Sequence, residues 1–146
     1  MIDFPRVPGK MCDWEVVRSV DGAQETLSVL SQSADLYIVT GAKESNEADI
    51  KSALARVNLD IYISGYFCLS NVGLSKGDHG FLPTVLNRLK ARSNTQPAEV
   101  AVVGNSYEAD IKPAIELGLR SYWLSDDKES TVDKSVTRIS NLQELI

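Results

Sequence analysis

The stretch that decides the fold covers residues 99–124, EVAVVGNSYEADIKPAIELGLRSYWL. Residues 100–103 are apolar, mostly β-branched, and stopped by Gly104. A short apolar run of this kind, with no alternation between polar and apolar residues, is typical of a strand that is buried on both faces of a parallel sheet. The sequence therefore predicts a buried parallel strand that ends at this glycine.

A helix and a second strand follow the polar turn after this strand. The pattern predicts a helix over 111–117, with Asp110 as its N-cap and Gly118 as its stop, and then a strand over 120–124. In parallel sheets, the loop at the carboxyl end of a strand is where ligands bind. Asn105 and Asp110 are the best polar candidates in that loop.

Composition limits the class of protein. The chain has 146 residues, 43% hydrophobic and 24% charged, as expected of one soluble domain with a single core. Its net charge of −5, with both signs interleaved, argues against nucleic acid or an anionic membrane as partner. It has no apolar run that could span a bilayer and no signal-peptide core. Cys12 and Cys68 lack metal-site spacing and are expected to be buried thiols of a cytoplasmic protein.

The rest of the chain repeats the alternation of helix and strand. Periodic apolar residues predict helices, and short apolar or aromatic runs predict strands. The predicted helices cover 23–33, 44–57 and 81–92, with a final helical turn at 142–146, and the predicted strands cover 36–39 and 136–139, with a strand or an extended link over 60–68. This order predicts an α/β fold, a three-layer α/β/α Rossmann-like parallel sheet in one domain over residues 1–146. Residues 1–19 are broken by prolines and a glycine, so we expect an irregular arm there.

The stretch 99–124 resembles the fourth motif of the haloacid dehalogenase (HAD) superfamily. In that motif a strand ends in Gly-Asp, and a second Asp follows a few residues later. Gly104 and Asp110 match this pattern, whereas Asn105 stands where the family has its first acid. The resemblance implies that Asn105 and Asp110 occupy metal-ligand positions.

Two further stretches resemble HAD motifs in the family's order. The predicted strand 36–39 ends in Thr40-Gly41, similar to the second motif, whose hydroxyl donates to a phosphoryl oxygen. Lys76 stands where the third motif has its lysine, which neutralises phosphate. The resemblance therefore implies that Thr40, Gly41 and Lys76 bind phosphate, and that Thr40 and Lys76 act in catalysis.

The first HAD motif, Asp-x-Asp-x-Thr or Val, is matched only in part. Asp3 fits the nucleophile position, which would also ligate the metal, but Pro5 replaces the second acid, the general acid/base. Asp13 fits the same motif spacing, but the segment between Asp13 and Thr40 is short for the flap and helix that precede the second motif in the family. The alternative is that Asp3 and Asp13 are ordinary surface acids of an irregular arm.

The resemblance implies a capless HAD-like core that hydrolyses phosphate monoesters through an aspartyl-phosphate. In the family Mg²⁺ assists this reaction, and here its ligands would be Asp3, Asn105 and Asp110. With one amide in place of a carboxylate and no acid/base at Pro5, we expect weak or unusual activity. The expected ligand is a small phosphorylated molecule. We also expect Thr40, Lys76, Asn105 and Asp110 to meet at one edge of the sheet.

Three alternatives to an ordinary enzyme remain open. The chain could be a catalytically inactive HAD-like domain that binds a phosphorylated ligand, a protein partner or a second copy of itself. The sequence could instead lack the first strand, so that the missing motif reflects where it was cut. A receiver-like signalling domain would use an early acidic pair, a Thr and a Lys in the same order, but the turn after residue 103 and the stretch around Lys76 favour the HAD-like interpretation.

Overall fold

The computed structural model describes residues 7–126 and 133–146. These residues fall into two compact units, Met1–Ser75 with Leu145–Ile146 and Lys76–Glu144, which are described separately below. Within the described ranges, no helix is long and apolar enough to cross a membrane. Parallel strands alternate with helices in both units, which confirms the predicted α/β class.

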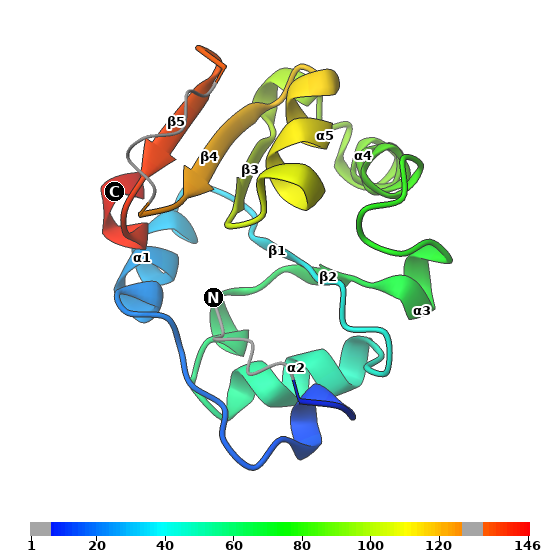
Figure 1. Cartoon of the computed structure of the whole chain (residues 1–146), viewed down its shortest axis with the longest axis vertical. Helices are drawn as coiled ribbons and strands as arrows, with labels where there is room; N and C mark the ends of the chain where they lie inside the picture. Colours follow the sequence, from blue (N-terminus) through cyan, green and yellow to red (C-terminus); the bar gives the residue numbers. More distant parts are fainter. Residues whose placement is uncertain (1–6, 127–132) are drawn as a thin grey trace. The chain divides into compact units, whose positions relative to one another are not determined.

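The first unit contains a two-stranded parallel sheet (Figure 1). Strand β1 pairs with β2 from Tyr37 opposite Gly65 to Val39 opposite Phe67. The elements are η1 Met11–Asp13, α1 Ala23–Leu30, β1 Tyr37–Val39, α2 Glu47–Ala55, η2 Asp60–Tyr62, β2 Gly65–Phe67 and α3 Leu69–Val72. The predicted strand over 60–68 is thus shorter than expected, because residues 60–62 form a 3-10 turn.

Asn46 and Asp49 form a capping box that fixes the start of helix α2. The Asn46 side chain accepts the Asp49 backbone N–H at 2.9 Å, and the Asp49 carboxylate accepts the Asn46 N–H at 3.0 Å. This reciprocal pair satisfies two N–H groups that have no partner inside the helix. The bonds to the Asn46 backbone also lower the pKa of Asp49. The predicted start at residue 44 is therefore three residues too early.

The segment before α1 is irregular but is anchored to α2. Met11 and Trp14 are each 5% exposed, and the Met11 N–H donates to the Ser45 hydroxyl at 2.8 Å. The Arg56 guanidinium, at the end of α2, donates to the carbonyl oxygens of Cys12 at 3.2 Å and Glu15 at 3.0 Å, and to that of Trp14. A single side chain therefore bonds three backbone carbonyls within four residues of an otherwise irregular segment.

The second unit contains a three-stranded parallel sheet in the order β3-β4-β5 (Figure 1). The elements are α4 Phe81–Ser93, η3 Pro97–Glu99, β3 Ala101–Gly104, a π-helical turn at Tyr107–Ile111, α5 Lys112–Glu116, β4 Arg120–Leu124, β5 Val136–Ile139 and η5 Leu142–Leu145. Helix α4 buries Phe81, Val85 and Leu89, the face that its periodicity predicts. The predicted strands 120–124 and 136–139 are confirmed.

Strand β3 is less buried than its composition predicts. Val103 is 39% exposed, and Ala101 is exposed as well. In the part of the chain that the structure describes, β3 pairs with β4 and with no second strand, so it is an edge strand of its sheet. The prediction of a strand at this position is confirmed, but the prediction that it is buried on both faces is wrong.

Arg56 gives the first testable prediction. Replacing it in Arg56→Met should lower the free energy of unfolding by about 1–2 kcal/mol, because three backbone carbonyls lose a charged donor. Lys51→Met removes an exposed cation from the same helix and should change stability far less. Urea unfolding of both variants is the measurement. Equal stability of the two would show that the anchoring bonds contribute nothing.

Candidate functional site

The last residue of β3, Gly104, and the two residues that follow it, Asn105 and Ser106, lead directly into the π-helical turn. We call these three residues the β3 loop. The Ser106 hydroxyl accepts the Ala109 backbone N–H at 3.2 Å, so Ser106 is the N-cap of the turn. The prediction that Asp110 caps a helix is therefore wrong. Asp110 lies inside the turn, and its carboxylate points back toward the loop, where it makes other bonds.

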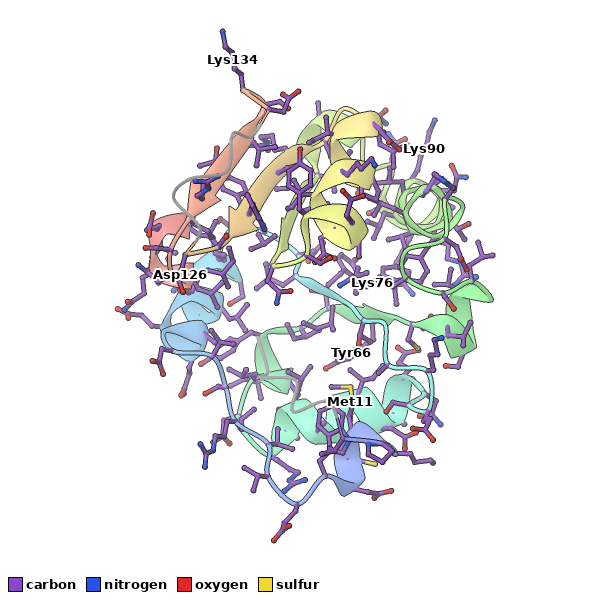
Figure 2. The ribbon with its side chains drawn as sticks, in the orientation of Figure 1. Met11, Tyr66, Lys76, Lys90, Asp126 and Lys134 are labelled. Atoms are coloured by element: carbon purple, nitrogen blue, oxygen red, sulfur yellow. The ribbon has the colours of Figure 1, made fainter. Side chains whose placement is uncertain are left out.

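Asp110 and Lys76 form the central ion pair of the second unit. The Lys76 ammonium lies 2.7 Å from Asp110 Oδ1, and the side chains are 23% and 6% exposed. Asp110 Oδ2 accepts the Ser106 backbone N–H at 3.2 Å. Figure 2 shows Lys76 beside the turn that follows β3. Both oxygens of a buried carboxylate are thus paired, which buried charge requires.

Gly104 makes this close arrangement possible. A Cβ atom built at Gly104 would overlap the Cβ, Cγ and Oδ2 atoms of Asp110. No side chain larger than hydrogen fits there unless Asp110 moves. The glycine that the sequence pattern interprets as the end of a strand is also the residue that lets the carboxylate approach the loop backbone.

The backbone of Asn105 is fixed by a hydrogen bond, whereas its side chain is exposed. The Trp123 indole N–H donates to the Asn105 carbonyl oxygen at 3.1 Å. The residue is exposed, and within the described residues its side-chain amide has no hydrogen-bond partner. Its amide group is therefore available to a ligand.

Ser106 and Trp123 are the site residues that sequence reasoning missed. A serine three residues before the turn's first bonded N–H is a recognisable cap, so the signal for Ser106 was present in the sequence. The role of Trp123 depends on the parallel register that places it opposite Gly104. That register is not visible in the sequence.

Thr40 lies in the first unit, directly after β1. Its backbone N–H continues the ladder by donating to the Phe67 carbonyl at 3.1 Å, and its hydroxyl accepts the Ala42 N–H at 3.1 Å. The hydroxyl proton remains available to donate, and Gly41 beside it is exposed. That Thr40 meets Lys76, Asn105 and Asp110 at one site remains a prediction.

Of the two acids expected near the N-terminus, only Asp13 lies among the described residues. Asp3 and Pro5 lie outside the described residues. Asp13 is exposed and belongs to the 3-10 turn η1, and the described residues 7–12 before it form no strand. The alternative that placed Asp13 at the end of a first strand is therefore wrong, because residues 11–13 turn to pack against α2.

The described residues offer few metal ligands. No group of three or more His, Cys, Asp or Glu side chains within residues 7–126 and 133–146 could hold a metal ion. In the second unit, Asp110 offers a carboxylate that already pairs with Lys76, and Asn105 offers a neutral amide oxygen. Proteins usually bind Mg²⁺ through one or two carboxylates, and these two residues supply only one.

Gly104 gives a prediction about this geometry. Gly104→Ala should destabilise the protein by about 1–3 kcal/mol, because the added methyl group overlaps Asp110. In an Asp110→Gly background the three atoms that the methyl group overlaps are absent, so its cost should fall to within about 0.5 kcal/mol of zero. Denaturant unfolding of the four proteins of this cycle is the measurement. An equal loss of unfolding free energy from Gly104→Ala in both backgrounds would show that the destabilisation does not come from overlap with Asp110.

Comparison with known proteins extends the resemblance seen in the sequence. No known family model matches the chain. YfnB of Bacillus subtilis (strain 168), a proposed HAD-hydrolase, is 29% identical over 130 residues, which cover 86% of this chain and 52% of YfnB. The chain thus spans about half the length of the curated relative that it matches. The crystal structure of YfnB bound to magnesium matches with a TM-score of 0.70 and 26% identity, over 86% of this chain and 54% of YfnB.

Two other solved structures share the fold. A HAD phosphatase from Thermococcus onnurineus matches with a TM-score of 0.71 and 21% identity, over 88% of this chain and 57% of its own. A 2-haloacid dehalogenase from Pseudomonas syringae pv. Tomato DC3000 matches with a TM-score of 0.67 and 21% identity, over 88% and 52%. These matches show that the chain has a HAD-like fold, and that its sequence is similar to that of YfnB.

Proposed function

We propose that the chain is a HAD-like phosphohydrolase core with weak or unusual activity toward phosphate monoesters. The observation that carries the proposal is the Lys76–Asp110 pair at the carboxyl end of β3. A lysine that is 23% exposed and paired on one side keeps ammonium protons for a second anion. A phosphate group is the anion that the family resemblance implies.

The proposal gives each described residue a chemical role. Lys76 neutralises charge on the phosphoryl oxygens, and it does so best in a site from which water is excluded. The Thr40 hydroxyl, with its oxygen already bonded to the Ala42 N–H, donates its proton to a phosphoryl oxygen. Asp110 holds the Lys76 ammonium in place. Asp3 is the proposed nucleophile, and it lies outside the described residues.

Magnesium is the proposed cofactor, in line with the magnesium-bound structure of YfnB. Asp110 and Asn105 are the described residues that would hold the ion. A bound Mg²⁺ would neutralise negative charge on the phosphoryl oxygens. Because Lys76 already occupies one oxygen of Asp110 and Asn105 carries no charge, we expect binding to be weaker than at a site with two free carboxylates.

A second candidate function is that of a catalytically inactive domain that binds a phosphorylated ligand or a protein partner. Asn105 favours it, because an amide replaces the acid that the HAD motif has at this position. Pro5 also stands where the general acid/base is expected, and such a group contributes about 10²–10⁴-fold to catalysis. With Asn105 and Pro5 at these two positions, binding of a phosphorylated ligand would be retained, whereas the rate of hydrolysis would be lowered.

Hydrolysis of p-nitrophenyl phosphate with Mg²⁺ separates the two functions. We expect slow release of phosphate that is abolished by Asp3→Asn and lowered about a hundred-fold by Lys76→Met. Lys112→Met is the matched control, because Lys112 pairs with the exposed Glu108 at 3.1 Å in the same unit. Inorganic phosphate binding without hydrolysis would favour the inactive domain, and the absence of both would refute the proposed phosphate site.

Asn105 gives a prediction about the metal. Asn105→Asp adds a carboxylate to the loop that carries Asp110, so Mg²⁺ should bind the variant more tightly than the native protein. At Mg²⁺ ten times above its dissociation constant, the variant should gain about 3 °C in melting temperature, since a ligand of the folded state stabilises it. The native protein should gain less.

Repulsion between the two carboxylates in the absence of metal provides the control. Without metal, a second carboxylate repels Asp110, so the variant should be no more stable than the native protein. Melting temperatures of both proteins with and without Mg²⁺, at fixed ionic strength, are the measurement. Equal responses to Mg²⁺ would show that position 105 does not face the metal.

A further inference from the structure

Trp123 connects the centre of the second sheet to the candidate site. It lies on β4 directly opposite Gly104 in the parallel register. Its indole N–H reaches past the end of β3 and donates to the Asn105 carbonyl oxygen at 3.1 Å. A side chain of the neighbouring strand therefore bonds the backbone of the residue that the HAD resemblance places at a ligand position.

The indole ring is fixed from several sides. Trp123 is 9% exposed and packs with Ile111 and Val136. The Tyr107 ring meets it edge-on at 5.2 Å, with an angle of 65° between the rings. The Arg138 guanidinium lies 5.1 Å from the ring centroid, on the opposing residue of β5. A ring held by these contacts points its N–H in one direction.

The β3 loop is thus held at two successive residues. The Asn105 carbonyl accepts the Trp123 N–H at 3.1 Å, and the N–H of the same peptide group, that of Ser106, donates to Asp110 Oδ2 at 3.2 Å. The two bonds act on the two residues that lie between Gly104 and the π-helical turn. Together they fix the peptide from which the Asn105 side chain projects.

We propose that Trp123 is a positioning residue of the β3 loop, which acts through the Asn105 backbone to place Asn105 and Ser106 relative to Lys76 and Asp110. The proposal rests on the proposed function to the extent that the loop serves a phosphate site. Small displacements of binding groups are costly, so a loop fixed before the ligand arrives binds it better. The contrasting role is that of a core residue which only fills space.

Two substitutions separate these roles. Trp123→Phe keeps an aromatic ring but removes the N–H that bonds Asn105. Arg138→Met removes the cation over the same ring and leaves that N–H in place. Trp14→Phe, at the other tryptophan and in the first unit, is the control for loss of an indole.

The first readout is the hydrogen exchange rate of the Ser106 amide, measured by NMR on the full chain. Trp123→Phe should raise this rate about five-fold beyond its rise in Arg138→Met, because the Ser106 N–H belongs to the peptide group whose carbonyl loses its bond. In the native protein, the Trp123 indole N–H should exchange more slowly than that of free tryptophan. This second measurement needs no variant to fold. Equal Ser106 rates in the two variants, or rapid exchange of the native indole N–H, would overturn the proposal.

The second readout is the affinity for inorganic phosphate, titrated in the same NMR experiments. Trp123→Phe should weaken binding about five-fold and Arg138→Met by less than that, since it keeps the N–H, whereas Trp14→Phe should leave binding within about two-fold of native. If the native protein binds no phosphate, the proposed function fails, and the exchange rates alone decide the role of Trp123. If phosphate binds native and Trp123→Phe equally well, positioning of the site by Trp123 is refuted.

Discussion

The ion pair between Lys76 and Asp110 is the interaction on which the candidate site depends. A carboxylate that is 6% exposed is unfavourable unless its oxygens are paired, and here Lys76 and the Ser106 N–H satisfy one oxygen each. The pairing requires the carboxylate to approach the backbone closely, which Gly104 allows because it lacks a Cβ. Removing one partner of such a pair leaves a buried charge uncompensated. The pair therefore constrains the loop, the turn and the segment at Lys76 together.

Much of the fold could be predicted because it follows from local patterns. Apolar runs ended by glycine or threonine gave β1 and β3, and periodic apolar residues gave α4 with its buried face of Phe81, Val85 and Leu89. The loop after β3 pointed to Asp110 and the resemblance to the third HAD motif pointed to Lys76, and the structure places these two side chains in contact. The prediction of Asp110 needed only the order of elements and the rule that loops at the carboxyl ends of parallel strands carry ligands, whereas the prediction of Lys76 also needed the family resemblance.

What could not be predicted depends on register and on competition between partners. Asp110 has the residue type of an N-cap, but Ser106 takes that role because the Asp110 carboxylate is drawn to Lys76 and the Ser106 N–H. The position of Trp123 beside Gly104 follows from how β3 and β4 align, which no single-sequence pattern reports. The exposure of Val103 likewise depends on how many strands flank β3, not on its own composition.

The replacement of an acid by Asn105 has an electrostatic consequence that connects fold and function. With Asp110 paired to Lys76, the charges of this pair balance without a metal ion. An acid at position 105 would add a negative charge to the same short loop, whose repulsion a bound cation would have to offset. Asparagine keeps an oxygen donor at that position and avoids the repulsion. Under the proposed function, an asparagine at position 105 therefore lowers both the repulsion within the loop and the attraction for Mg²⁺.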